Sequence, residues 1–257
     1  MENNFNILGL LLGRAGSRGY PGKNVAPVLG RPCLHYPLMA ARSSGLMDKI
    51  YLSTDSKDIT REAQSFDTIS IERPPELATD EALLEDAIYH AFQEIDQREG
   101  GKFDAVLIIL CNAPTVTPER LREAAKLLRS ENDLDSVTTG AKLNMYTPVR
   151  ARRRDEKTGR LENYIPLETL NKIVTISCDR DAAEDCYFCD HSFTLVRRSA
   201  LASMPTNNGP FRWMGNNIRM IEQPAGACDI DYGWQVGGIE HWLQEHGITV
   251  AEVPFWK

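Results

Sequence analysis

The chain has 257 residues, of which 42% are hydrophobic and 25% are charged. These ordinary values exclude disorder, collagen-like repeats and a coiled coil, and the length suits one large domain or a domain with an insertion. The formal net charge of −7 disfavours a general nucleic-acid-binding surface, which usually requires a basic balance.

No apolar run in the sequence is long enough to cross a membrane. The longest runs, at 7–12 and 105–110, are far shorter than the roughly 20 residues that a spanning helix needs. The N-terminus lacks the basic region of a signal peptide, so a cytoplasmic protein is expected. The six scattered cysteines do not indicate a disulfide framework in a chain of this size.

Strands and helices are predicted to alternate along the first 140 residues. Strands are expected at 6–12, 49–54, 68–71, 103–110 and 135–140, and helices at 32–44, 56–66, 79–97 and 117–130. Such alternation is typical of an α/β protein with a doubly wound, mainly parallel sheet and helices on both faces. Ligands of such sheets bind at the carboxyl ends of the strands.

Residues 141–190 interrupt this alternation. They are polar and charged, and they include Arg150-Ala-Arg-Arg-Arg154 and the turn-like Lys157-Thr-Gly-Arg160. Within a single domain over 1–257, we expect them to form a hairpin-rich insertion that covers the site or contacts a second copy of the chain. After the insertion, strands are expected at 192–196, 217–221 and 249–253, and a last helix at 232–245.

A glycine-rich segment, Gly13–Asn24, directly follows the first predicted strand. Its four glycines allow backbone amides to approach an anion closely, and Arg14, Arg18 and Lys23 add positive charge. The lysine is not followed by Ser or Thr and a helix, and the glycine spacing differs from the dinucleotide fingerprint. The three cations favour a distinct phosphate-binding loop over a flexible surface loop.

Two further segments could bind a metal ion. In extended backbone, Asp229 and Asp231 face the same way, so they could hold Mg²⁺, although Asp231 could equally be a helix cap. The segment Cys186-Tyr-Phe-Cys189-Asp-His191 matches zinc spacing only in part, because a second paired motif is missing. For these cysteines, free thiols that pack as small apolar groups are favoured.

Four motifs in sequence order resemble those of the cytidylyltransferases that activate acidic sugars, the CMP-acylneuraminate synthetases and their relatives. The first, R-x-x-S-[KR]-G-x-P-x-K-N, is complete from Arg14 to Asn24. The others are Ser53-Thr-Asp55, Arg73-Pro-Pro-Glu-Leu-Ala-Thr-Asp80 and Asp229-Ile-Asp231. The resemblance implies a nucleotide-diphospho-sugar-transferase-like, Rossmann-like fold and a CTP- and Mg²⁺-dependent nucleotidyltransferase, in which an acceptor oxygen attacks the α-phosphate and pyrophosphate leaves.

The resemblance also implies roles for individual residues. Arg14, Lys23 and Asp231 would be catalytic, and Asp229 with Asp231 would hold the metal. The nucleotide would be bound by Arg14, Gly16, Ser17, Arg18, Lys23, Asn24, Arg73 and Ala82. In such a transfer, positioning and electrostatic neutralisation carry most of the catalysis.

The acceptor side departs from the family pattern. The family's L-Q-P-T-S-P is replaced by Leu110-Cys-Asn-Ala-Pro-Thr115, so Asn112 stands near the position of the glutamine. A nonulosonic, sialic-acid-like 2-keto sugar acid is the expected acceptor. A phosphonate, or nucleotidyl transfer to a sugar 1-phosphate, is the alternative. A catalytically silent binding protein with this fold is disfavoured by the complete first motif and the two aspartates.

The resemblance further places five residues on the acceptor side: Asn112, Arg150, Arg180, Asp190 and His191. For Arg150, a solvated basic loop is an equally supported alternative, and for His191 a hydrogen-bonded core histidine is slightly favoured. The resemblance also implies a homodimer. CTP and a small acidic acceptor are thus the expected partners, with no nucleic acid and no membrane.

Overall fold

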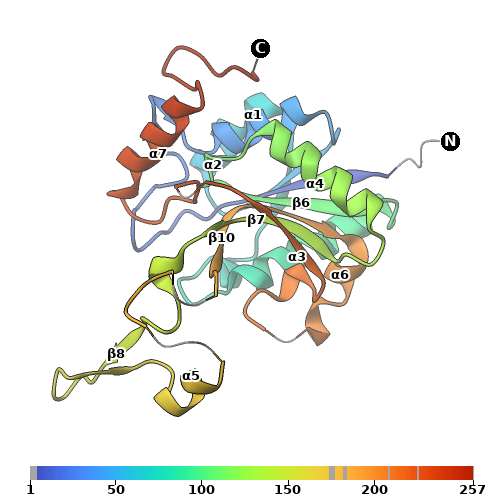
Figure 1. Cartoon of the computed structure of the whole chain (residues 1–257). Coiled ribbons are helices and arrows are strands. Elements are labelled where there is room, and N and C mark those ends of the chain that lie inside the picture. Colours follow the sequence, from blue (N-terminus) through green and yellow to red (C-terminus); the bar gives the residue numbers. More distant parts are fainter. Residues whose placement is uncertain (1–4, 174–176, 182–183, 208, 225, 257) are drawn as a thin grey trace. The chain divides into compact units, whose positions relative to one another are not determined.

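The computed structural model describes residues 5–173, 177–181, 184–207, 209–224 and 226–256. Its centre is a seven-stranded sheet in the order β11-β7-β10-β6-β1-β4-β5 (Figure 1). The strands are β1 (Ile7–Leu12), β4 (Ile50–Thr54), β5 (Thr68–Glu72), β6 (Ala105–Leu110), β7 (Ser136–Lys142), β10 (Tyr187–Arg197) and β11 (Ile218–Glu222). No helix among the described residues is both long and apolar enough to cross a membrane.

The sheet is mainly parallel, which confirms the predicted fold class. β1 pairs in parallel with β4 and β6, β4 pairs in parallel with β5, and β10 runs antiparallel to β6. Every residue of β1 is buried, as expected for a strand covered on both faces. Leu12 is in register with Ser53 on one side and with Leu110 on the other, so the three strands end at one edge.

Helices cover both faces of the sheet, with α1 and α4 on one side and α3 and α6 on the other (Figure 1). They are α1 (His35–Ser44), α2 (Lys57–Ala63), α3 (Leu84–Glu99), α4 (Pro118–Ser130), α6 (Arg198–Ala202) and α7 (Gln235–Glu245). The side chain of Ser56 accepts a hydrogen bond from the Ile59 amide, and that of Thr117 from the Arg120 amide, so both are N-caps. Short 3₁₀ turns occur at Gln64–Phe66, Pro75–Leu77, Asn144–Tyr146, Met204–Thr206 and Arg212–Met214.

Several predicted boundaries were wrong. The first helix starts at His35 rather than at 32, because Pro32 pairs in a two-stranded ribbon of β2 (Pro27–Val28) and β3 (Arg31–Pro32). The helix predicted from 79 starts at Leu84, because Leu83 adopts an extended conformation directly before it. The helix predicted from 232 starts at Gln235.

The strand predicted at 249–253 is also wrong. In this segment the Thr249 amide donates to the Glu252 carbonyl at 2.8 Å. The Glu252 amide in turn donates to the Thr249 hydroxyl at 3.0 Å, so the segment folds back on itself, whereas a strand directs its amides to a neighbouring strand. Of its apolar residues, Val250 and Ala251 are exposed and Val253 is buried.

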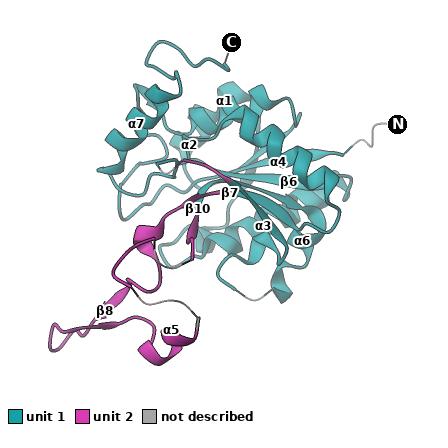
Figure 2. Cartoon of the chain, in the orientation of Figure 1, with its two compact units in different colours: residues 1–139, 190–221, 226–257 teal, residues 140–189, 222–225 magenta. Residues whose placement is uncertain are grey.

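The chain divides into two compact units (Figure 2). The first consists of residues 1–139, 190–221 and 226–257, and the second of residues 140–189 and 222–225. The second unit corresponds closely to the insertion expected at 141–190, and it contains the antiparallel hairpin of β8 (Arg152–Arg154) and β9 (Leu161–Asn163), together with α5 (Leu167–Ile173). Within this unit, Lys142 forms an ion pair of 2.7 Å with Asp185.

Candidate active site

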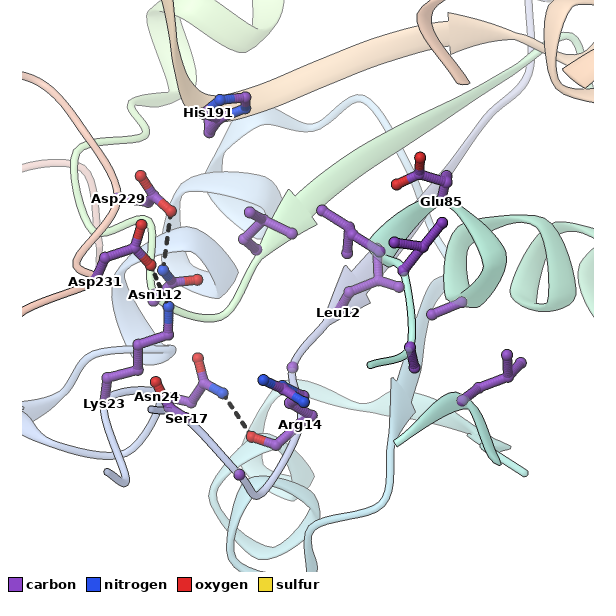
Figure 3. A pocket seen from close by; sticks show the side chains of 18 of the residues that line it. Leu12, Arg14, Ser17, Lys23, Asn24, Glu85, Asn112, His191, Asp229 and Asp231 are labelled. Carbon is purple, nitrogen blue, oxygen red and sulfur yellow. Dashed lines mark hydrogen bonds and ion pairs between the residues drawn. The ribbon is translucent and has the colours of Figure 1, made fainter. Parts of the chain in front are cut away.

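A cavity of about 450 Å³ lies within the first unit, where β1 and β6 end (Figure 3). It is lined by most of the residues that the sequence assigned to nucleotide binding: Arg14, Gly16, Ser17, Lys23, Asn24, Arg73 and Ala82. It is also lined by Asn112, His191, Asp229 and Asp231, which come from distant parts of the chain. The fold therefore brings the first motif and the closing aspartates to one site.

The glycine-rich loop presents free backbone donors beside its cations. Within the described residues, the amides of Gly16, Ser17 and Arg18 donate to no protein acceptor. The loop is braced from within, because the Asn24 side-chain amide donates to the Arg14 carbonyl at 2.9 Å. The Asn24 Oδ1 atom is buried without a donor from the described protein, so it can accept a hydrogen bond from a ligand.

Both arginines of the loop are paired with an acidic residue. Asp80 lies 3.0 Å from Arg14 Nη2 and 3.0 Å from Arg18 Nε, and the hydrogen bond from Arg18 lowers the pKa of Asp80. Arg14 also donates to the Thr79 carbonyl, and it lines the cavity. The Arg18 side chain is 68% exposed and is not among the lining residues, so its direct contact with a nucleotide stays a prediction.

The two residues predicted to contact the cytosine, Arg73 and Ala82, form hydrogen bonds within the protein. Arg73 is buried, and its guanidinium donates to the Ser53 carbonyl at 2.7 Å and to the Ser53 hydroxyl at 3.2 Å. Burial lowers the pKa of Arg73. The backbone amide of Ala82 already donates to the Thr79 hydroxyl, so Ala82 offers a ligand only its backbone carbonyl oxygen.

Asp229 and Asp231 lie beside one another, and each contacts one polar side chain of the site, Lys23 of the loop or Asn112 after β6. Lys23 Nζ is 2.5 Å from Asp231 Oδ1, and Asn112 Nδ2 donates to Asp229 Oδ2 at 3.1 Å (Figure 3). Asn112 also exchanges backbone and side-chain hydrogen bonds with Ile230. The amide predicted to meet the acceptor is thus occupied by the aspartate segment.

The two aspartates fit a divalent cation. Burial, followed by the charge of Asp231, raises the pKa of Asp229, so a positive ion would relieve the cost of this pair. Carboxylate oxygens are also the ligands that Mg²⁺ prefers, alongside substrate phosphates. The alternative of a helix cap does not hold, because α7 begins after Trp234, and the Asp231 amide itself is bonded by the Gln235 side chain.

Of the predicted acceptor residues, His191 lines the cavity, whereas its neighbour Asp190 does not. Asp190 is buried and accepts hydrogen bonds from the Thr139 hydroxyl at 2.6 Å and from the Ser192 amide at 2.9 Å. His191 is half-buried, adopts a positive φ of 54° and lines the cavity. The favoured interpretation of His191 as a core histidine was therefore wrong, and Asp190 instead braces the backbone around it.

The remaining acceptor candidates belong to the second unit. Arg150 is exposed there, and Arg180 forms an ion pair of 3.1 Å with Asp181. Their contact with an acceptor stays a prediction. Among the residues described, no group of three or more His, Cys, Asp and Glu side chains could hold a metal, so the zinc alternative for Cys186 and Cys189 gains no support.

Sequence reasoning missed an aromatic wall of the cavity. Phe211 and Trp213 line it with their rings 5.4 Å apart, and the His191 ring lies 5.3 Å from Phe211. Trp213 is buried, and its indole nitrogen has no acceptor among the described residues. Phe211 and Trp213 lie at a single 3₁₀ turn, which is too short to give a periodic sequence pattern.

The comparisons with known proteins agree with this site. A sequence profile described as cytidylyltransferase matches residues 8–156, and the chain belongs to this family. It is 31% identical over 233 residues to the N-acylneuraminate cytidylyltransferase of Oncorhynchus mykiss. The aligned residues make up 90% of this chain and 49% of that protein. It is also 31% identical over 122 residues to the CMP-N,N'-diacetyllegionaminic acid synthase of Legionella pneumophila, covering 47% of this chain and 52% of that protein. The chain thus spans about half the length of these relatives.

The fold is shared with two solved structures. A structure of CMP:2-keto-3-deoxy-manno-octonic acid synthetase complexed with CTP matches with a TM-score of 0.66 and 14% identity, over 94% of this chain and 99% of that chain. A 4-diphosphocytidyl-2C-methyl-D-erythritol synthase from Anaerococcus prevotii matches with a TM-score of 0.60 and 13% identity. The Rossmann-like α/β fold predicted from the sequence is confirmed.

Substitution of two glycines of the loop is expected to affect stability differently. A Cβ atom at Gly19 would lie 2.4 Å from the Asp231 backbone oxygen, whereas one at Gly16 would meet nothing within 4 Å. We expect Gly19→Ala to lower the free energy of unfolding by about 1–3 kcal/mol, the usual range for overpacking. Gly16→Ala is the matched control, and denaturation without ligand measures both. Equal stability of the two variants would contradict the packing of the loop against the aspartate segment.

Proposed function

We propose that this chain transfers CMP from CTP to a small acidic acceptor and releases pyrophosphate. The single observation that carries the proposal is the meeting of Arg14, Ser17, Lys23 and Asn24 of the glycine-rich loop with Asp229 and Asp231 in one cavity. The free amides and cations of the loop suit a triphosphate, and the carboxylates suit its counter-ion. The family membership of the chain supports the same reaction class.

In this proposal, the loop holds the charge of the triphosphate. Arg14 and Lys23 neutralise its oxygens, and the amides of Gly16 and Ser17 bind it directly. As pyrophosphate leaves, these groups stabilise the charge that develops on it, which is how phosphoryl-type transfers gain most of their rate. The unpartnered Asn24 Oδ1 accepts a hydrogen bond from the nucleoside.

We further propose that Asp229 and Asp231 hold Mg²⁺. The bound ion would supply positive charge to the phosphate oxygens. Asn112 orients Asp229 through its 3.1 Å hydrogen bond, and Lys23 keeps Asp231 at the loop. Lys23 is thereby shared between the carboxylate and the incoming phosphates, so it is the residue whose partner we expect to change when CTP binds.

For the acceptor, we propose a nonulosonic 2-keto sugar acid, as the names of the curated relatives suggest. A phosphonate is the second candidate, because Asn112 stands near the family's glutamine and its amide is used within the protein. Transfer to a sugar 1-phosphate is the third. His191 and the wall of Phe211 and Trp213 are the acceptor-facing surface of the first unit in each case.

Pyrophosphate release tests the reaction and the acceptor together. With CTP and Mg²⁺, we expect release with sugar acids or with phosphonates, and loss of release on chelation with EDTA. Asp231→Asn should lower the rate by about 100-fold or more, in line with the loss of one electrostatic group at a reacting phosphate. Asp58→Asn, at an exposed position paired with Arg61, is the matched control.

The outcomes of this assay separate the alternatives. Release with only one acceptor class identifies that class. Release with another nucleoside triphosphate and a sugar 1-phosphate would replace CTP in the proposal. Full activity of Asp231→Asn would refute the metal assignment, and stabilisation by CTP without any turnover across the panel would favour a binding protein.

His191 predicts a selective effect on the acceptor. We expect His191→Ala to raise the KM for the acceptor by roughly tenfold, equivalent to one lost hydrogen bond, and to leave the KM for CTP unchanged. His191→Asn retains a polar group and tolerates the positive φ, so it should be milder. Steady-state kinetics with each substrate varied in turn measures both. A rise in the KM for CTP alone would place His191 on the nucleotide side.

We also propose that the chain forms a homodimer through its second unit. This unit exposes large apolar side chains: Met145, Tyr146, Leu161, Tyr164, Leu167, Tyr187 and Phe188. Tyr146 and Phe188 are in ring contact, and large apolar side chains that are exposed together mark surfaces that another protein covers. Light scattering should give twice the 28.8 kDa mass of the chain, and the double variant Leu161→Arg, Tyr164→Arg should shift it to one chain. A monomeric wild type at micromolar concentration would contradict the proposal.

A further inference from the structure

The motif Ser53-Thr54-Asp55 has no role in the proposed chemistry, yet all its side chains are engaged. Ser53 accepts hydrogen bonds from the buried Arg73, and the Thr54 hydroxyl accepts one from the Ser56 amide at 3.0 Å. The Asp55 carboxylate accepts the Ala15 amide at 2.9 Å. This last bond joins the end of β4 to the glycine-rich loop, 40 residues earlier in the chain.

The register of the sheet sets up this contact. Leu12 and Ser53 are partners in the parallel pair of β1 and β4, so both chains leave the sheet at the same level. Three residues after Leu12 and two after Ser53, the two chains meet again through Ala15 and Asp55. Asp55 itself is not among the residues that line the cavity, so it does not act on a ligand directly.

The bond determines which amides of the loop are free. The Ala15 amide is directed at Asp55, and the next amides, of Gly16 and Ser17, have no acceptor within the described protein. Successive amides form an anion-binding concavity only when the backbone is held with their hydrogens converging. A carboxylate that fixes the first amide of the series would hold the others in the position to bind phosphate.

We infer that Asp55 is a positioning residue for the phosphate-binding loop, acting through the Ala15 amide. The inference rests on the proposed function, since it specifies how the loop binds the triphosphate of CTP. It separates two possible contributions of Asp55. One is the hydrogen bond to Ala15, which needs an oxygen at this place, and the other is the negative charge near Arg73, which needs a carboxylate.

Three substitutions distinguish these contributions. Asp55→Asn keeps an oxygen acceptor for Ala15 and removes the charge. Asp55→Glu keeps the charge and displaces the oxygen by one methylene. Asp55→Ala removes both. Asp58→Ala is the matched control, because it removes a carboxylate from the exposed first turn of α2, outside the cavity.

Calorimetric titration of each full-length variant with CTP, inorganic tripolyphosphate and cytidine gives the readout. We expect Asp55→Ala and Asp55→Glu to weaken binding of CTP and tripolyphosphate by about tenfold, and to leave cytidine binding unchanged. Asp55→Asn and Asp58→Ala should bind all three within about twofold of the wild type. A selective loss of the phosphate probes is not expected from a general loss of structure.

Several outcomes would overturn the inference. These are unchanged CTP binding in Asp55→Ala, a loss in Asp55→Asn as large as in Asp55→Ala, or an equal loss for cytidine. If Asp55→Ala does not fold, the comparison of Asp55→Asn with Asp55→Glu still decides between hydrogen bond and charge. Failure of the wild type to bind CTP at all would refute the proposed function instead, so the two failures are distinguishable.

Discussion

The parallel register of β4, β1 and β6 is the constraint on which the site depends. Since Leu12 is level with both Ser53 and Leu110, the segments that follow these residues leave the sheet together. This register brings the glycine-rich loop between Asp55 and Asn112. A slip of one residue would reverse the faces of every buried side chain in β1, so packing of the core fixes the register strongly.

Charge balance is the second organising element. The cations of the loop each face a carboxylate, Arg14 and Arg18 with Asp80, and Lys23 with Asp231. An acidic protein can thus carry a concentrated basic loop, since the positive charge is neutralised locally until an anion competes for it. The exposed pair of Arg18 and Asp80 contributes little to stability by itself, and its importance lies in where it holds the side chains.

The sequence was sufficient for the fold class, the first motif and the aspartate pair. Continuous apolar strands such as Ala105–Leu110 and helix caps such as Thr117 are local signals, and local signals survive in the fold. It was insufficient for residues whose role depends on tertiary neighbours. Phe211 and Trp213 lie at a single 3₁₀ turn, and the positive φ of His191 occurs between Asp190 and Ser192, which are hydrogen-bonded to each other. The start of α3 was misplaced because the capping bond from the Ala82 amide to the Thr79 hydroxyl is followed by the extended residue Leu83, which interrupts the helix.

The strand order has a consequence for how the chain is made. β10 lies between β6 and β7, although it follows β7 by more than forty residues in the sequence. During synthesis, β6 and β7 therefore cannot pair with β10 until the second unit and residues 187–197 have left the ribosome. Until then, an apolar strand edge is open on the nascent chain, which is the situation that favours intermolecular association. The insertion thus delays closure of the central sheet, and chaperone dependence should fall on this interval of translation.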